Sequence, residues 1–270
     1  LMPELPEVET TLRAIEKFKN QRLSHIKVHN RNLRWEVDKN LEKKSKNQII
    51  KNLRRRAKYI IFDLDKRSII LHLGMSGSLR IANNDDNYCL KHDHVEFFFN
   101  NEKIIYNDPR RFGSIHLTED IDKHRLINHL GPEPLSKDFN SKYLLALCSR
   151  SKTNIKTLLM NQKNVVGIGN IYASETLYLS KVNPLKDSSK LTINDCKKVV
   201  SSSKKILNAA IKVGGTTLKD FYSADGSPGY FKFKLNVYGR KDLDCKKCKT
   251  KIKKVNINKR ATYFCPSCQD

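Results

Sequence analysis

Four cysteines near the end of the 270-residue chain constrain its fold more than any other feature. They form two C-x2-C pairs separated by 16 residues, a spacing typical of a zinc site. Because four thiolates complete the tetrahedral coordination of zinc, such a metal is structural and not catalytic. A redox role for either pair would not explain why there are two pairs. We therefore predict one structural Zn²⁺ held by Cys245, Cys248, Cys265 and Cys268.

The segment between the two pairs, KTKIKKVNINKRATYF, carries six Lys or Arg residues and alternates in the manner of a β-hairpin. The whole chain has 52 Lys and Arg against 28 Asp and Glu, a net charge of +24, which indicates a polyanionic partner. A membrane surface is the rival to nucleic acid, but no apolar run approaches the ~20 residues of a membrane span. Without an N-terminal secretory signal, the expectation is a cytoplasmic protein that binds DNA or RNA.

Three further cysteines are scattered along the chain and odd in number, which argues against a disulfide framework. We interpret Cys89, Cys148 and Cys196 as small buried hydrophobic residues.

Hydrophobic periodicity divides the chain into a β-rich first half and a helical second half. Residues 59–74 and 94–108 each hold two strand-like runs around a polar turn, which predicts antiparallel hairpins in a two-layer sandwich. Two prolines and a glycine in residues 130–139 predict a linker. Helices are expected near 140–149, 153–163 and 169–182, and a longer one from a capping-box-like Thr192 to Gly214–Gly215.

The acidic stretch PELPEVE at residues 3–9 opens this otherwise basic chain. Apolar residues follow at helical spacing, so Pro6 suits the first helical position, and Glu7 and Glu9 suit the positive end of the helix dipole. This helix-start reading gives no reason for the preceding Pro3–Glu4 pair.

Several short segments, in their order and spacing, resemble bacterial formamidopyrimidine-DNA glycosylases, which excise 8-oxoguanine. They are PELPEVET, RRAKYI, HLGMSGSLR, DPRRFG, LGPEPL, VVGIGNIYASE, GGTTLKDF, DGSPGYF and VYGR, together with the four cysteines. The resemblance implies an α+β fold of two domains with DNA in the cleft between them. Its parts would be a β-sandwich catalytic domain with flanking helices (3–130), a linker (131–138), a helix–two-turn–helix domain (139–235) and a zinc-finger β-hairpin (236–270).

The resemblance also assigns chemistry to the N-terminus. Proline offers a secondary amine as nucleophile only when it is the first residue, and an α-amino group has a pKa of roughly 7.7–8.0. Pro3 would then form a Schiff base with the sugar, Glu4 would act as general acid and Glu7 as a supporting carboxylate, while Lys58 would contact the lesion side. Since a proline in peptide linkage cannot attack, we expect Leu1 and Met2 to be removed before activity.

A glycosylase that everts its target base must fill the hole left in the duplex. By resemblance, Met75, Arg110 and Phe112 fill it, with Arg110 facing the orphaned cytosine; residue type alone favours core packing or a surface charge. The remaining expected DNA contacts are His72, Asn170 and Arg260. The loop that would close over the everted base runs from Lys219 to Tyr230 and includes Tyr222 and Ser223.

The resulting prediction is a monomeric base-excision-repair enzyme of the bacterial cytoplasm, associated with the nucleoid and without membrane contact. It would remove oxidised purines from double-stranded DNA and then cut the strand by β,δ-elimination. One alternative is the related endonuclease VIII, which removes oxidised pyrimidines. Another is a non-catalytic zinc-finger DNA-binding protein, which fits the charge and cysteines but needs no Pro3–Glu4 pair.

Overall fold

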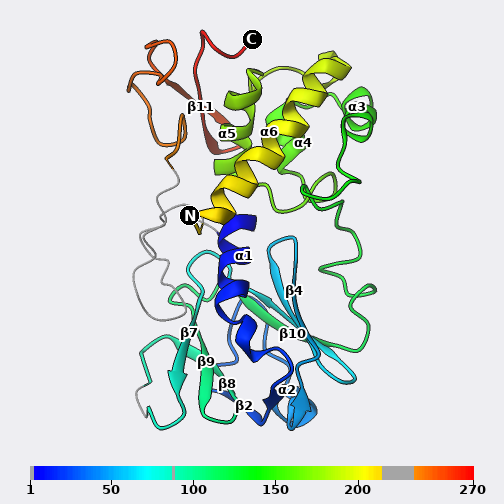
Figure 1. Ribbon diagram of the computed structural model, residues 1–270, viewed down its shortest axis with the longest axis vertical. Helices are drawn as coiled ribbons and strands as arrows, with labels where there is room; N and C mark the ends of the chain where they lie inside the picture. The colour runs from blue at the N-terminus through cyan, green and yellow to red at the C-terminus, as the bar shows by residue number, and fades with distance from the viewer. Residues whose placement is uncertain (1–2, 87–88, 215–233) are drawn as a thin grey trace. The chain divides into compact units, whose positions relative to one another are not determined.

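The computed structural model describes residues 3–86, 89–214 and 234–270, and the chain divides into two units (Figure 1). The first unit comprises Leu1–Asn128, and the second contains His129–Val213 together with the C-terminal residues from 234 onward. The finer division of the second part into a linker, a helical domain and a zinc finger at the predicted bounds stays a prediction.

The first unit contains two four-stranded antiparallel sheets. One has the order β10-β6-β5-β4, with strands Ser114–Thr118, Ser68–His72, Tyr59–Asp63 and Asn52–Arg56. The other has the order β2-β8-β9-β7, with strands His25–Val28, Asp93–Phe98, Glu102–Asn107 and Ser78–Asn83. Both predicted hairpins are therefore confirmed, as β5–β6 and β8–β9. Shorter elements complete the unit: β1 (Arg22–Leu23) pairs with β3 (Gln48–Ile49), and α2 spans Leu41–Ser45.

Aromatic residues from both sheets meet in the core of this unit. The rings of Phe62 on β5 and Phe97 on β8 stack in parallel with centroids 5.5 Å apart, and both side chains are fully buried. Phe18 and Phe99 make a second contact at 4.3 Å. The Phe62–Phe97 contact joins the two layers, as expected for a sandwich whose sheets each turn one apolar face inward.

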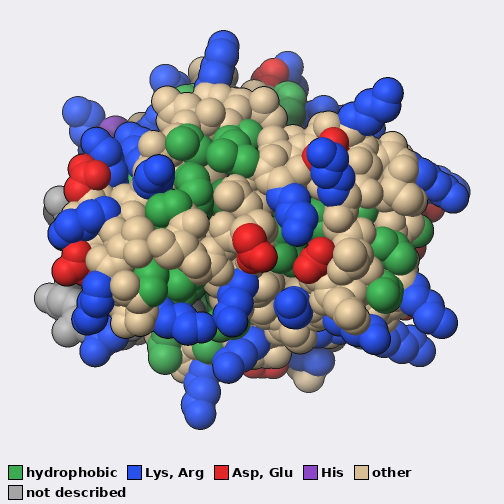
Figure 2. Space-filling view, turned by 90° about the horizontal axis from the view of Figure 1, so that it is seen from above, with side chains coloured by type: hydrophobic (Ala, Val, Ile, Leu, Met, Phe, Trp, Pro, Cys, Tyr) green, Lys and Arg blue, Asp and Glu red, His purple; other side chains and the backbone are tan. Residues whose placement is uncertain are grey.

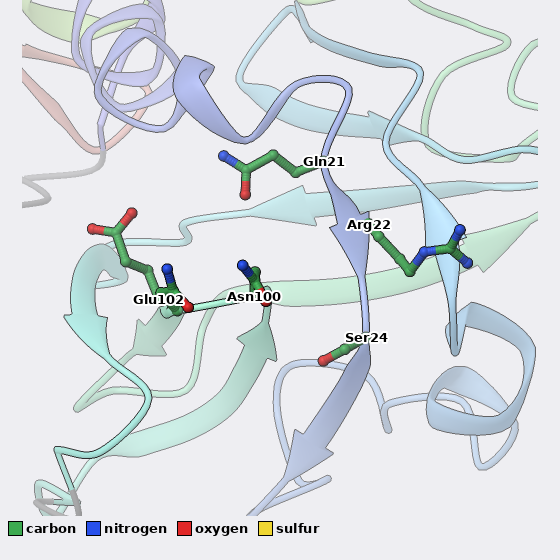
Figure 3. A pocket seen from close by; sticks show the side chains of 6 residues that line it. Gln21, Arg22, Ser24, Asn100 and Glu102 are labelled. Carbon is green, nitrogen blue, oxygen red and sulfur yellow. The ribbon is translucent and has the colours of Figure 1, made fainter.

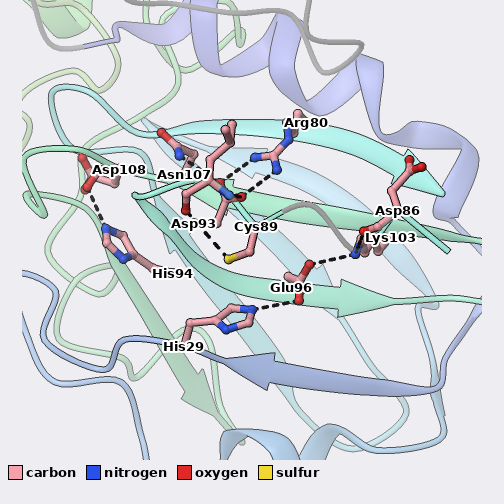
Figure 4. A network of polar contacts seen from close by, with 11 residues as sticks. His29, Arg80, Asp86, Cys89, Asp93, His94, Glu96, Lys103, Asn107 and Asp108 are labelled. Atoms are coloured by element: carbon pink, nitrogen blue, oxygen red, sulfur yellow. Dashed lines mark hydrogen bonds and ion pairs between the residues drawn. The ribbon is translucent and has the colours of Figure 1, made fainter. Parts of the chain in front are cut away.

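A buried polar network follows β8 and its neighbours (Figure 4). The Asp93 carboxylate accepts two hydrogen bonds from Arg80, at 2.5 and 2.6 Å, and Glu96 pairs with His29 at 2.8 Å and Lys103 at 3.0 Å. Burial raises the pKa of Glu96, but the hydrogen bonds from His29 and Lys103 outweigh it and hold that pKa below its usual value. Each buried carboxylate on this strand thus has a cationic partner, which a buried charge requires.

The second unit is helical. Its helices are α3 (Ser141–Ser149), α4 (Ile155–Met160), α5 (Asn170–Ser180) and α6 (Ile193–Lys212). Asn140 and Asn154 cap α3 and α4, and Thr192 with Asp195 forms the predicted capping box of α6. Helix α4 is shorter than predicted because it starts only after its cap, Asn154, and ends at Asn161 in extended backbone. Among the described residues, no helix has the length and apolarity to cross a membrane.

The C-terminal hairpin consists of β11 (Lys253–Ile257) and β12 (Arg260–Phe264). Its two turn residues, Asn258 and Lys259, have φ values of 48° and 62°, which is the geometry of the tight turns favoured in hairpins. Cys148 and Cys196 are buried as predicted, but Cys89 is exposed. That prediction was wrong because Cys89 lies in the polar β7–β8 connection and not on a core-facing strand position.

We expect Phe97→Ala to lower the free energy of unfolding by about 3–5 kcal/mol, since it removes one ring of the inter-sheet stack. Phe112→Ala, at a side chain that is 43% exposed, should change it by less than about 0.5 kcal/mol. Urea denaturation of both variants measures the difference, and equal stabilities would contradict the role of the stack.

Candidate active site and nucleic-acid interface

The start of helix α1 (Leu5–Ala14) fixes the predicted catalytic residues in a buried position. Glu4 is the N-cap, and its backbone N–H donates to the Glu7 carboxylate at 3.0 Å, which forms part of a capping box. Pro3 is buried, Glu4 is 3% exposed and Glu7 is fully buried. The helix begins at Leu5, so Pro6 occupies its second position and not the predicted first one.

Glu9 ties this helix to the turn that carries Lys58. Its carboxylate pairs with Arg13 at 3.1 Å and with Arg55 at 2.9 Å, and Arg55 also donates to the carbonyl of Ala57 at 2.9 Å. Ala57 has φ = 54°, and this left-handed residue turns the chain from β4 into β5, directly before Lys58. Glu9 is therefore a tertiary anchor, and not simply the dipole-matched acid that the sequence suggested. Lys58 itself is 6% exposed.

His72 ends strand β6 and lies opposite Tyr59 in the β5–β6 register, one residue from Lys58. Its Nδ1 accepts a hydrogen bond from the Gly74 N–H at 3.0 Å. Burial, followed by the positive charges of Lys58 and Arg34, lowers the pKa of His72 to about 4. The ring is therefore neutral at physiological pH with its proton on Nε2, which suits it to donate a hydrogen bond to a phosphate oxygen.

The buried carboxylate of Asp108 holds together the two loops that carry Met75, Arg110 and Phe112. It accepts hydrogen bonds from the Ser76 hydroxyl at 2.6 Å, the Tyr106 hydroxyl at 3.0 Å and the Gly113 N–H at 2.8 Å. The Ser76 hydroxyl oxygen in turn accepts the Arg110 N–H at 3.1 Å. The sequence placed Asp108 within the DPRRFG segment without giving it a role, because only the tertiary structure shows that it is fully buried.

Two glycines allow the backbones of these loops to touch. A Cβ on Gly74, which has φ = 66°, would lie 2.3 Å from the Gly113 nitrogen, and a Cβ on Gly113 would lie 1.8 Å from the Tyr106 hydroxyl. The structure thereby brings the predicted filling residues to one place. Met75 is half-buried, Phe112 is 43% exposed, and the guanidinium of exposed Arg110 lies 4.8 Å from the Phe112 ring centroid.

In the second unit, a buried lysine joins α5 to the hairpin. The Lys156 ammonium, 1% exposed, donates to Asn170 Oδ1 at 2.5 Å and to Thr262 Oγ1 at 2.7 Å. Asn170 Nδ2 donates to the Ala261 carbonyl at 2.9 Å. These contacts place Asn170, at the N-terminus of α5, beside the strand that Arg260 begins. Arg260 is exposed and lines a pocket of about 310 Å³ formed by α4 and the hairpin turn.

The four C-terminal cysteines form a cluster suited to one zinc ion. Their sulfur atoms all lie within 4.8 Å of one another, with Cys248–Cys265 at 3.4 Å and Cys245–Cys268 at 4.0 Å. Tetrahedral zinc with Zn–S bonds of about 2.3 Å requires sulfur separations of about 3.8 Å. The donor set and its spacing therefore fit the predicted Zn²⁺.

Two residues of helix α5 contact the cysteine cluster or the chain that leads into it, and the sequence reasoning missed both. The Tyr178 hydroxyl lies 3.3 Å from Cys245 Sγ. The buried Glu175 carboxylate accepts the backbone N–H groups of Asn236, Val237 and Tyr238 at 2.8–3.0 Å, which fixes the chain entering the zinc module. No sequence pattern links Glu175 and Tyr178 to their partners, which are 60 or more positions away in the chain.

A larger pocket of about 600 Å³ lies elsewhere, lined by Gln21, Arg22, Ser24, Asn100, Asn101 and Glu102 (Figure 3). None of the predicted site residues lines it, so we assign it no role in the chemistry. The predicted lid residues Lys219, Tyr222, Ser223 and Tyr230 lie outside the described residues, as do Leu1 and Met2.

Comparison with known proteins supports the same reading of the whole chain. Residues 2–115 match the formamidopyrimidine-DNA glycosylase N-terminal domain, 130–222 its H2TH domain, and 244–270 a zinc finger found in FPG and IleRS. The chain is 47% identical over 271 residues to the formamidopyrimidine-DNA glycosylase of Hydrogenovibrio crunogenus, across 99% of this chain and 96% of that one. It is 49% identical over 271 residues to the formamidopyrimidine-DNA glycosylase of Haemophilus influenzae, across 99% of each chain. The chain belongs to the formamidopyrimidine-DNA glycosylase family.

Solved structures of family members bound to DNA have the same fold. The complex of Lactococcus lactis Fpg with DNA containing an abasic site aligns with a TM-score of 0.90 at 36% identity, covering 99% of each chain. A complex of a Lactococcus lactis FPG mutant with DNA containing Fapy-dG aligns with a TM-score of 0.91 at 36% identity, covering 99% of this chain and 100% of that one. The predicted family, the α+β fold and the zinc finger are therefore confirmed.

We expect Asp108→Asn to destabilise the protein by about 1–3 kcal/mol, because an amide cannot accept from all three donors that the carboxylate satisfies. Asp122→Asn makes the same chemical change on an exposed side chain and should leave the stability unchanged. Urea denaturation compares them, and an unaffected Asp108→Asn variant would rule out the anchor role.

Tyr178→Phe should release zinc about 10-fold more readily, since the hydroxyl is the group that reaches the Cys245 sulfur. The measurement is competition for zinc with a chromogenic chelator. Tyr263→Phe is the matched control, because Tyr263 packs against the same cluster and its hydroxyl makes no hydrogen bond within the described part of the chain. Equal zinc retention in the two variants would count against the contact.

Proposed function

We propose that this protein is a bifunctional DNA glycosylase and AP lyase of base excision repair that removes oxidised purines from duplex DNA. The observation that carries the proposal is the buried Pro3–Glu4 pair at the start of α1, held by Glu7 and linked through Glu9 and Arg55 to the turn before Lys58. The Glu4–Glu7 hydrogen bond belongs to the capping box of α1, but a helix start does not need the Glu9–Arg55 contact, whereas a reaction centre needs its groups fixed in place.

In this proposal the nitrogen of Pro3 attacks C1′ of the damaged nucleotide, and the base leaves. Glu4 supplies a proton to the opening sugar ring, which leads to a Schiff base between Pro3 and the sugar. β,δ-Elimination then cuts the strand, and hydrolysis frees the proline. The mechanism requires Pro3 to be the first residue of the active enzyme, because only then is the lone pair of its nitrogen free of amide resonance and able to attack.

The other predicted site residues would support this reaction. Glu7 holds the Glu4 backbone, and Lys58 would contact the lesion side. Met75, Arg110 and Phe112 would fill the gap in the duplex, since Asp108 brings their loops together and leaves Arg110 and Phe112 exposed. Lys219, Tyr222, Ser223 and Tyr230 would close over the everted base.

Phosphate contacts are proposed in both units. In the first unit, His72 offers a fixed Nε2–H donor. In the second, Asn170 opens helix α5, whose N–H groups favour an anion, and Arg260 begins the strand that the Asn170 amide contacts. Zinc, when bound by the four cysteines, would stabilise the loops at the base of that hairpin. Lys and Arg side chains project widely over the face shown in Figure 2, in keeping with a DNA partner.

We further propose that the protein acts as a monomer in the bacterial cytoplasm, where it associates with the nucleoid. The net charge of +24 supports retention on DNA.

Borohydride trapping tests the function. A protein that begins at Pro3, incubated with duplex carrying 8-oxoguanine opposite cytosine, should give a covalent adduct on reduction. The same chain with Leu1 and Met2 retained should give none, although it should still bind the duplex.

The control substrates separate the alternatives. An adduct only with an oxidised pyrimidine would instead identify an endonuclease VIII-like activity. Absence of any adduct from the form that begins at Pro3 would leave a non-catalytic DNA-binding protein.

A further inference from the structure

Two arginines pack over the ring of the only tryptophan of the chain. The guanidinium carbon of Arg34 lies 4.6 Å from the ring centroid of Trp35, and that of Arg125 lies 4.7 Å from it. Trp35 is half-buried, whereas both arginines are exposed. Cation–π contacts of this kind hold a guanidinium plane in place and leave its N–H edge free for other partners.

The Trp35 ring also contacts the ring of His116, which carries no charge. The His116 ring lies 5.5 Å from Trp35, and His124 lies 5.3 Å from His116. Burial, followed by His124 and Arg125, lowers the pKa of His116 to about 4, so it remains neutral at physiological pH. The positive charge of the cluster therefore belongs to Arg34 and Arg125.

Neither arginine has a carboxylate partner within the described residues. Other arginines of the same sheet region do: Arg54 pairs with Asp63 at 2.6 Å, and Arg67 pairs with Glu119 at 2.8 Å. The positive charge of Arg34 instead faces His72, and it contributes to lowering the pKa of that histidine. Like charges gathered without counter-charges repel one another in the free protein, which a bound anion would relieve.

The cluster is joined to the residues that meet DNA in the proposed function. The backbone N–H of Arg34 donates to the carbonyl of Gly113 at 3.1 Å, directly after Phe112. Asp108 holds that same glycine through its N–H. The two arginines thus extend a set of donors that already contains His72 and Arg110.

We propose that Arg34 and Arg125, held over the ring of Trp35, form a binding site for the phosphodiester backbone of DNA, beyond the contacts made by His72, Arg110, Asn170 and Arg260. The proposal rests on the proposed function for the identity of its ligand. Flat guanidinium groups with free edges match phosphate oxygens, to which they donate paired hydrogen bonds.

The salt dependence of binding tests this site. The probe is a duplex carrying a tetrahydrofuran abasic analogue, which the enzyme cannot cleave. Each phosphate contact contributes about 0.9 to the slope of log K against log salt concentration. Arg34→Gln and Arg125→Gln should each reduce the slope by about that amount, whereas Arg67→Gln, which removes an already paired charge, should leave it unchanged.

Two further measurements complete the test. Arg34→Lys, which keeps the charge, should restore most of the slope, and this excludes misfolding as the cause of the loss. In the unsubstituted protein, saturation with the duplex should alter the fluorescence of Trp35 and protect it from acrylamide, because the ligand covers the cluster.

A slope that Arg34→Gln and Arg125→Gln leave unchanged would overturn the proposal, whatever the fluorescence shows. Borohydride trapping on 8-oxoguanine duplex by the same variants keeps the two proposals apart. An adduct with an unchanged slope means that only the phosphate site has failed.

Discussion

The buried carboxylate of Asp108 is the interaction on which the geometry of the first unit's site depends. It accepts hydrogen bonds from three separate segments: from Ser76 in the loop after β6, from Tyr106 on β9 and from Gly113 before β10. A fully buried charge is stable only when its hydrogen bonds are satisfied. The hydrogen bonds of the carboxylate therefore hold the two loops together, and the exposed Arg110 and Phe112 project from the loop that they fix.

The second unit uses the same principle with charges of both signs. The buried ammonium of Lys156 joins α4, α5 and β12, and the buried carboxylate of Glu175 holds the backbone of residues 236–238. Most Lys and Arg side chains of this basic chain remain on the surface. The buried Lys156 and Glu175 instead hold neighbouring segments of the second unit in position. Arg34 and Arg125 stand out in this pattern because they are immobilised and yet lack an anionic partner within the described residues.

Local features of the sequence predicted local structure well. The β5–β6 and β8–β9 hairpins follow from β-branched and aromatic runs around polar turns, and α6 follows from Thr192 and Asp195 at its start. The errors arose where a tertiary contact overrides local preference, or where a residue lies in a connection and not on a strand. Glu9 was read as a dipole-matched acid but pairs with Arg55, 46 residues away, and Cys89 was read as buried but lies in an exposed connection.

The sequence by itself determined the zinc ligands, the β5–β6 and β8–β9 hairpins, the capped start of α6 and the family, because each depends on residue types at fixed short spacings. Only the tertiary structure decided that Asp108 joins two loops, that Lys156 and Glu175 fix the second unit, and that Arg34 and Arg125 both pack over the ring of Trp35. These depend on residues far apart in the chain, whose burial and partners are set by packing. The positions that hold the site together are therefore the ones that short-range patterns could not reveal.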